Sequence, residues 1–184
     1  GNEIGIRNDQ YSSAHVIRNH FKNNKTAIYN YRKSNPLVEK NLLEQNDLVI
    51  FCDYSSYPVV HLNNFSNNRM VAQLGVYQSG DWEKQYGSKD IMQKEAAGRK
   101  GRNPRIDTIS TEVSEVIDIS RNWWGEDTIK LQAVGENGNL EMFHDRHDQP
   151  RVFYEGFAAE GYIFDLIQFA PWLTAPVADI GPER

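Results

Sequence analysis

The chain has 184 residues, a formal net charge of −5 and one cysteine, Cys52. A chain of this length can bury about 70% of its unfolded surface in one core. The single cysteine excludes disulfide scaffolds and cysteine-rich zinc ribbons. It indicates either a reducing compartment or a fold that is indifferent to redox state, and we expect a cytoplasmic protein. No apolar run reaches the roughly 18 residues of a membrane span, so we expect a soluble protein without a membrane partner.

The N-terminal half is predicted to contain two short helices followed by strands. Ser12 or Ser13 can cap a first helix, whose apolar residues recur with helical spacing up to Phe21. Pro36 suits the first position of a second helix over residues 36–45. KTAIYNYRKS, which lies between the two helices, alternates as a strand does. The later apolar runs predict an antiparallel meander over residues 47–78.

The C-terminal half is predicted to extend this sheet. TIKLQAV and LEMFH flank the segment GENGN. They predict a β-hairpin, because Asn137-Gly138 accepts the positive φ of a tight turn. RVFYEGF adds a strand, and residues 159–169 have the spacing of a closing helix that ends at Pro171. We identify no internal repeat in the sequence.

Two or three helices and about seven strands predict an α+β domain with a mostly antiparallel, curved sheet or a small β-barrel. We expect one domain over residues 1–184. Between residues 79 and 105 the pattern of apolar residues breaks down, and a helix over residues 89–97 is followed by a glycine-containing basic stretch. This segment is therefore predicted to be an insertion or a mobile basic segment.

The element order and the phrases LLEQNDLVIFCDY and RMVAQLGVYQ resemble the PUA-related barrels, which include the EVE and YTH domains. The resemblance covers about residues 12–78. Those families usually have Gly-Asp before the strand that corresponds to DLVIF, whereas this chain has Asn46-Asp47. The resemblance implies a barrel that binds modified bases or RNA in an aromatic pocket. No pocket residue of the family can be assigned to a position here.

A cluster of basic residues lies in residues 94–105, KEAAGRKGRNPR, and it contrasts with the acidic character of the whole chain. The five basic residues are Lys94, Arg99, Lys100, Arg102 and Arg105. Such a local positive charge predicts contacts with the phosphates of a nucleic acid or a nucleotide-like anion. The alternative is a flexible surface loop, since such loops often collect Lys and Arg.

Trp123 and Trp124 follow in the polar stretch SRNWWGED. Two large rings in a connection of this kind predict a stacking platform for a base, a sugar ring or a peptide. The alternative is packing, with one ring closing the end of the sheet and the other on its edge.

The stretch HDRHD, residues 144–148, contains two imidazoles and two carboxylates. His144 and His147 can approach one divalent metal ion, and Asp145 or Asp148 can supply an oxygen ligand or orient a ring. The alternative is a charged turn.

Cys52 and His61 are a second candidate pair. Cys52 could be a thiol nucleophile and His61 its base. The alternative is that Cys52 is a buried, inert thiol.

No phosphate-binding loop, dinucleotide fingerprint or nucleophile elbow is present. The sequence therefore predicts a non-catalytic binding domain, with nucleic acid or a nucleotide-like anion bound by the basic segment and stacked near the two tryptophans. One alternative is a divalent-metal-dependent, nuclease-like hydrolase that uses HDRHD. Another is a structural or assembly subunit, because asparagine-rich loops and a proline-containing tail suit docking surfaces.

Overall fold

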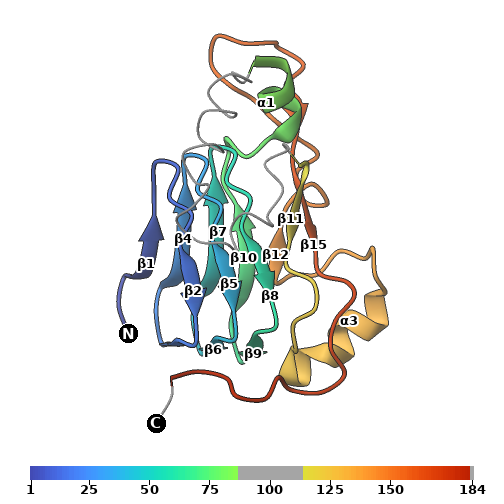
Figure 1. Cartoon of the computed structure of the whole chain (residues 1–184). Coiled ribbons are helices and arrows are strands. Elements are labelled where there is room, and N and C mark those ends of the chain that lie inside the picture. The colour runs from blue at the N-terminus through green and yellow to red at the C-terminus, as the bar shows by residue number, and fades with distance from the viewer. Residues whose placement is uncertain (87–113, 183–184) are drawn as a thin grey trace.

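The structure is a computed structural model that describes residues 1–86 and 114–182. Most of the described chain winds through parallel strands, which stack side by side in three ladders (Figure 1). The first sheet consists of β1 (Ile4–Asn8), β4 (Thr26–Tyr31), β7 (Leu48–Asp53), β10 (Met70–Leu74) and β12 (Phe143–His144). The second consists of β2 (His15–Ile17), β5 (Leu37–Glu39), β8 (Val59–His61), β11 (Val116–Asp118) and β15 (Leu166–Gln168). The third consists of β3 (His20–Lys22), β6 (Leu42–Glu44) and β9 (Asn64–Ser66).

The remaining elements lie between or beside the coils. They are α1 (Gly80–Tyr86), the 3-10 helix η2 (Gly125–Asp127), α3 (Thr128–Val134) and the antiparallel pair β13 (Arg151–Val152) and β14 (Tyr162–Ile163). None of the helices in the described residues is long and apolar enough to cross a membrane.

The strands of the first three coils repeat with a period of 22 residues. Ile28 pairs with Ile50 in the first sheet, Val38 pairs with Val60 in the second and Leu43 pairs with Phe65 in the third. Hydrogen bonds between side chains of successive coils span the same 22 residues. The fold is therefore a parallel β-solenoid, and the predicted antiparallel sheet or small barrel is wrong. The sequence does contain an internal repeat, contrary to our expectation.

The corners of the coils explain why the chain turns where it does. Arg18, Lys40 and Leu62 have φ values of 56°, 55° and 56°, in the left-handed region that bends the chain sharply. An asparagine follows each of them. Asn41 Oδ1 accepts a hydrogen bond from the backbone N–H of Asn19 at 2.8 Å, and the contact recurs at the two following coils, with Asn63 Oδ1 at 2.9 Å and Asn122 Oδ1 at 2.8 Å.

A second asparagine ladder stabilises the corner after the third sheet. The backbone N–H of Asn24 donates to Asn46 Oδ1 at 3.0 Å, and that of Asn46 donates to Asn68 Oδ1 at 3.0 Å. Backbone groups at the corners point along the solenoid axis without a strand partner, and a buried group of this kind must be paired. The asparagine side chains supply those partners.

The apolar core fills the inside of the coils. Val38, Leu43, Val49 and Val60 are completely buried in it. Within one coil, a three-residue strand, a two-residue corner and another three-residue strand place inward side chains such as Val16 and Phe21 five residues apart. The corner interrupts the alternation of a single strand, so apolar residues such as Ala14, Ile17 and Phe21 fall three and four residues apart. Val38 and Leu42 are likewise four residues apart. These are helical spacings, which explains why both segments were predicted to be helices.

The predicted helices and hairpin are corrected accordingly. The helix expected after Ser12 is β2 and β3, and the helix expected over residues 36–45 is β5 and β6. The closing helix expected over residues 159–169 is β14 and β15. The hairpin expected around GENGN contains α3 instead of its first strand. The resemblance to PUA-related barrels is wrong, because residues 12–78 form parallel coils.

The regular period ends after β10. Asn63 and Asn122 occupy equivalent corners although they are 59 residues apart. The additional chain contains α1, which lies beyond the carboxyl ends of the first sheet's strands (Figure 1). The helix predicted over residues 89–97 lies outside the described residues.

Candidate functional site: an aromatic pocket at one end of the first sheet

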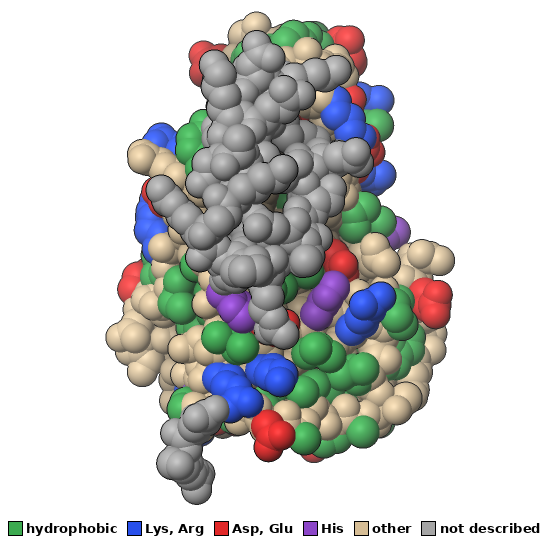
Figure 2. All heavy atoms as spheres, in the orientation of Figure 1, with side chains coloured by type: hydrophobic (Ala, Val, Ile, Leu, Met, Phe, Trp, Pro, Cys, Tyr) green, Lys and Arg blue, Asp and Glu red, His purple; other side chains and the backbone are tan. Residues whose placement is uncertain are grey.

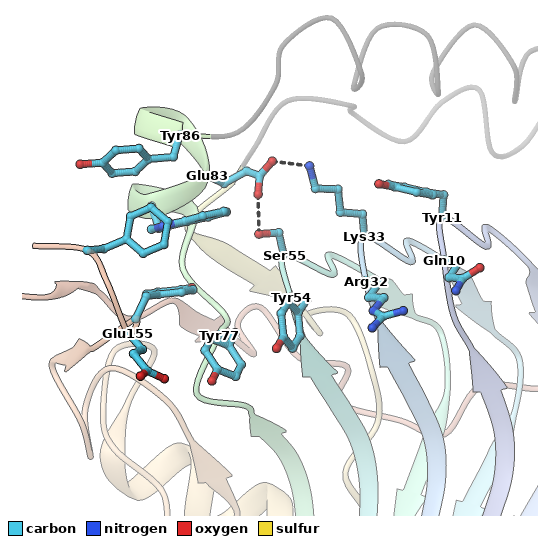
Figure 3. A pocket seen from close by; sticks show the side chains of 13 residues that line it. Gln10, Tyr11, Arg32, Lys33, Tyr54, Ser55, Tyr77, Glu83, Tyr86 and Glu155 are labelled. Atoms are coloured by element: carbon cyan, nitrogen blue, oxygen red, sulfur yellow. Dashed lines mark hydrogen bonds and ion pairs between the residues drawn. The ribbon is translucent and has the colours of Figure 1, made fainter.

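A pocket with a volume of about 670 Å³ lies at the carboxyl ends of β1, β4 and β7 (Figure 3). Successive coils contribute the same two positions to it, and all six residues have positive φ values between 51° and 64°. These residues are Gln10 and Tyr11, Arg32 and Lys33, and Tyr54 and Ser55. The 22-residue repeat therefore aligns one turn of each coil along the pocket.

Aromatic rings form a continuous wall of the pocket. The ring centroids of Tyr54 and Tyr77 are 4.6 Å apart, and those of Tyr77 and Tyr154 are 5.3 Å apart. Trp82 stacks on Tyr154 with a centroid distance of 5.1 Å and an interplanar angle of 10°. Phe157 meets the Trp82 ring edge to face at 5.6 Å. Such contacts fix large rings in place and leave their outer faces available to a ligand.

A buried carboxylate anchors α1 over the turns. Glu83 is 2% exposed. Its Oε1 is 2.5 Å from Lys33 Nζ, and its Oε2 accepts a hydrogen bond from Ser55 Oγ at 2.9 Å (Figure 3). A buried carboxylate is stable only when it is paired in this way. Because Glu83 and Trp82 are neighbours on α1, this contact also positions one side of the aromatic wall.

The charged residues that line the pocket balance one another. The basic residues are Arg32 and Lys33, and the acidic ones are Glu83 and Glu155. Lys33 and Glu83 neutralise each other. The guanidinium carbon of Arg32 lies 5.3 Å from the centre of the Tyr31 ring. Within the described chain, Arg32 and Glu155 take part in no ion pair.

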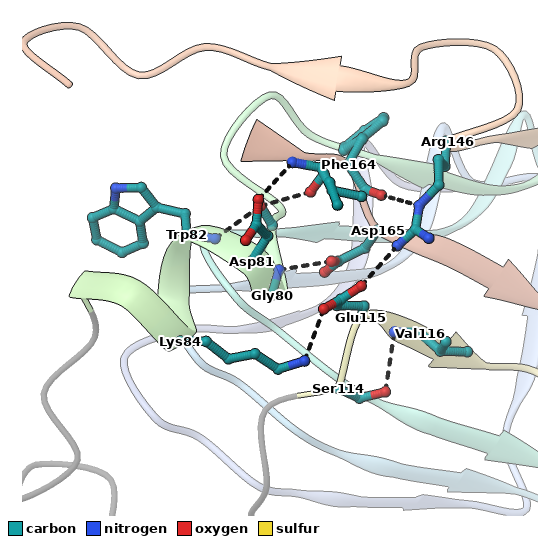
Figure 4. A network of polar contacts seen from close by, with 12 residues as sticks. Gly80, Asp81, Trp82, Lys84, Ser114, Glu115, Val116, Arg146, Phe164 and Asp165 are labelled. Carbon is teal, nitrogen blue, oxygen red and sulfur yellow. Dashed lines mark hydrogen bonds and ion pairs between the residues drawn. The ribbon is translucent and has the colours of Figure 1, made fainter. Parts of the chain in front are cut away.

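Two further carboxylates lie beneath the pocket and brace its floor. Asp53 accepts hydrogen bonds from the backbone N–H groups of Tyr54 and Tyr77 at 2.9 and 2.8 Å. Asp165 accepts one from the Gly80 N–H at 2.7 Å (Figure 4). Burial raises the pKa of Asp53, and burial also raises the pKa of Asp165 to about 6 against the lowering effect of the Gly80 hydrogen bond.

A surface network next to Asp165 joins α1 to the last coil (Figure 4). Glu115 accepts contacts from Lys84 at 2.8 Å and from Arg146 at 3.3 Å. The Arg146 Nε also donates to the backbone carbonyl of Phe164 at 2.6 Å. These carboxylates hold chain segments together, and neither Asp165 nor Glu115 lines the pocket.

The two tryptophans singled out from the sequence lie elsewhere. Trp124 is completely buried and stacks on Phe65 with a centroid distance of 4.6 Å. Trp123 is half-buried and forms a parallel bridge to Asn64, which continues the third sheet by one coil. Trp124 is therefore a core residue that a ligand cannot reach, and neither residue lines the aromatic pocket.

HDRHD is a hydrogen-bonded turn. Asp145 is 2% exposed and accepts hydrogen bonds from the N–H groups of His147 and Ile167 at 2.8 and 2.7 Å. Asp148 accepts one from the Asp145 N–H at 3.1 Å, and it lies 3.7 Å from His144 Nδ1. Among the residues that the structure describes, no three metal-binding side chains come together. HDRHD therefore forms a charged turn, and the divalent-metal site stays a prediction without a third ligand among the described residues.

The pair of Cys52 and His61 is also not brought together. Cys52 is completely buried in β7, where desolvation raises the pKa of its thiol. His61 instead contacts Asp118 Oδ2 at 2.8 Å. The buried, inert thiol is therefore the correct interpretation.

The basic segment with Lys94, Arg99, Lys100, Arg102 and Arg105 lies outside the described residues. On the visible part of the face in Figure 2, basic and acidic side chains are interspersed and are not gathered by sign. The described chain therefore shows no basic face there that would suit a phosphate backbone.

The sequence reasoning missed every residue of the aromatic pocket. The available signal was the recurrence of Gln10-Tyr11, Arg32-Lys33 and Tyr54-Ser55 at intervals of 22 residues, each pair shortly after a strand. Trp82 and Tyr154 reach the pocket only through the fold, since they lie in α1 and in the loop after β13.

Comparison with known proteins supports the fold. Residues 1–82 match the model of a family described as a right handed beta helix region. This match covers the three regular coils and β10. No curated protein and no solved structure has a significant match to the chain.

Proposed function

We propose that this protein is a non-catalytic binding domain and that the aromatic pocket binds a carbohydrate chain. The observation that carries the proposal is the aromatic wall formed by Tyr54, Tyr77, Tyr154 and Trp82 in a pocket that opens to solvent. The C–H faces of sugar rings stack on aromatic rings. Hydroxyl, amide and charged groups around such a wall bind the sugar hydroxyl groups.

The charge of the pocket favours a carbohydrate over a nucleic acid. A site for a phosphate backbone has an excess of Lys and Arg. Of the residues that the structure describes, two basic and two acidic ones line this pocket, and Lys33 is already neutralised by Glu83. The nucleic-acid prediction rested on the basic segment, which lies outside the described residues.

The carboxylates favour binding without catalysis. Hydrolysis of a glycosidic bond generally requires two carboxyl groups that flank the bond. Of the described acids that line the pocket, Glu83 is buried and paired, which leaves Glu155 as the single exposed carboxylate in this part of the chain. Asp53 and Asp165 are buried beneath the floor, where they hold backbone N–H groups.

A glycan array, with RNA and DNA oligonucleotides as additional probes, tests this proposal. We expect binding to a subset of the glycans, and we expect Tyr77→Ala and Trp82→Ala each to weaken it about tenfold through lost ring contacts. Phe153→Ala is the matched control, because this ring is 61% exposed and does not line the pocket. Thermal unfolding confirms that each variant folds.

Two results would overturn the proposal. One is a protein that binds no glycan on the array. The other is preferential binding to the oligonucleotides, with an affinity that Tyr77→Ala and Trp82→Ala do not change. The ligand would then lie outside the aromatic pocket.

Two earlier expectations stay proposals. A cytoplasmic location rests on the single, unpaired Cys52. An assembly role is favoured by β1, β2 and β3, each of which ends its sheet with one edge that pairs with no other strand of the described residues. Light scattering of the purified protein tests the assembly role, and a strict monomer at all concentrations would contradict it.

A further inference from the structure

We infer that the carbohydrate carries an anionic group, either a carboxylate or a sulfate, and that Arg32 binds this group at one end of the pocket. The inference rests on the proposed function and specifies the ligand class of the same site. Its basis is the difference between the two neighbouring cations that line the pocket, Arg32 and Lys33.

Lys33 is not available to a ligand. Its Nζ lies 2.5 Å from a carboxylate oxygen of Glu83, which is itself buried. Displacing Lys33 would leave Glu83 as an unpaired buried charge, which is costly. Lys33 therefore has a structural role in holding α1.

Arg32 is exposed and has no acidic partner among the described residues. Its guanidinium carbon lies 5.3 Å from the centre of the Tyr31 ring. A cation held close to an aromatic ring in this way keeps N–H groups that are not used by a protein acceptor. A fork of two such N–H groups matches the two oxygens of a carboxylate or a sulfate.

Glu155 complements Arg32 across the aromatic wall. Figure 3 shows Tyr77 and Tyr54 between Glu155 and Arg32. The carboxylate of Glu155 is exposed and can accept hydrogen bonds from sugar hydroxyl groups, but it repels an anion. The two ends of the pocket therefore differ in charge, and an anionic substituent is favoured only at the Arg32 end.

The test uses polysaccharides that share a backbone and differ only in the charged group. Dextran, xylan and galactan are each prepared in neutral, carboxymethylated and sulfated forms, and their affinities are measured by affinity electrophoresis. We expect at least one anionic form to bind about tenfold or more tightly than its neutral parent, and Arg32→Gln to abolish that preference. Comparison of the carboxymethylated and sulfated forms identifies the anion.

Two controls accompany this variant. Glu155→Gln is expected to keep the preference for the anionic form, because it removes a negative charge from the pocket. Replacement of Lys94, Arg99, Lys100, Arg102 and Arg105 by Gln is also expected to keep it. Loss of the preference in this second control would overturn the inference, since the basic segment would then be the anion site.

The outcomes separate the two proposals. Neutral polysaccharides that bind as well as their anionic forms would overturn the inference and leave the carbohydrate proposal intact. An equal loss of neutral and anionic binding in Arg32→Gln would also overturn it, because Arg32 would then contact no anion. A protein that binds none of the polysaccharides would overturn both proposals.

Discussion

Asn41 is completely buried in the middle of the first asparagine ladder. Its backbone N–H donates to Asn63 Oδ1, its Oδ1 accepts from the Asn19 N–H, and its Nδ2 donates to the carbonyl of Val16 at 2.8 Å. The Nδ2 also donates to the carbonyl of Glu39 at 2.9 Å, so one side chain satisfies backbone groups of its own coil and of the preceding one. The interactions of Asn41 are neither helical nor part of a strand ladder, and they determine where the chain turns.

We predict that Asn41→Ala destabilises the protein by about 3 kcal/mol, because several buried backbone groups lose their partners and each costs about 1–3 kcal/mol. Urea unfolding followed by circular dichroism measures the change. Asn137→Ala is the control, since Asn137 is an exposed residue after α3, and we expect no more than about 0.5 kcal/mol there. An Asn41→Ala protein as stable as the control would show that the ladder does not stabilise the fold.

At the scale of the elements, β8 and β11 are neighbours in the second sheet. More residues lie between them in the sequence than between any other two neighbouring strands of that sheet. In their parallel register, Val59 is the partner of Asp118. His61 adds a contact of 2.8 Å to the Asp118 carboxylate. This side-chain contact joins two neighbouring coils that are far apart in the sequence.

We predict that this contact makes stability depend on pH in the acidic range. Burial tends to raise the pKa of Asp118, but contacts with His61 and Ser120 outweigh burial and lower that pKa to about 2. A carboxyl group whose pKa is lower in the folded state contributes stability that is fully present above its unfolded pKa of about 4 and is lost as pH falls to about 2. With 38% of the side chain exposed, screening reduces the contribution to about 1 kcal/mol.

Urea unfolding of the wild type and Asp118→Asn at pH 7, 5, 3 and 2 measures this contribution. The wild type is expected to be more stable at pH 7 and 5, and the difference is expected to shrink between pH 4 and pH 2. A difference that stays constant down to pH 2 would contradict the assigned pKa. Asp47→Asn serves as the surface control, because Asp47 is 63% exposed and lies 3.8 Å from Arg69.

At the scale of the whole molecule, the C-terminal segment runs back across the coils (Figure 1). The Leu173 N–H donates to the carbonyl of Asn122 at 2.9 Å. Asn64 and Val177 exchange two hydrogen bonds, and the Gly181 N–H donates to the carbonyl of Lys40 at 3.0 Å. The segment therefore contacts three successive coils and ties them together.

We predict that removal of residues 173–184 lowers the melting temperature by about 10 °C. Four hydrogen bonds of about 0.5–1 kcal/mol are lost, and 1 kcal/mol corresponds to about 2–4 °C in a chain of this size. Differential scanning calorimetry measures the shift. Removal of residues 182–184, which keeps Gly181, is the matched control and should leave the melting temperature unchanged. Equal melting temperatures for the two truncations would show that the segment does not stabilise the coils.

The sequence by itself determined the local features of this protein. The strands in KTAIYNYRKS and DLVIFCDY are β4 and β7, as their alternation and apolar character predict. Cys52 is a buried thiol because it lies within an apolar strand. HDRHD is a turn because its carboxylates accept hydrogen bonds from nearby backbone N–H groups.

Only the tertiary structure decided which strands are neighbours and where the pocket lies. The partner of each regular strand is 22 residues away. Two short strands joined by a corner also place apolar residues three and four apart, as a helix does, when one coil is considered by itself. In the segment TIKLQAV, alternation predicts a strand, but α3 satisfies its own backbone hydrogen bonds and buries only Leu131. The pocket combines turns of successive coils with α1 and the loop after β13, and such long-range packing has no local signal in the sequence.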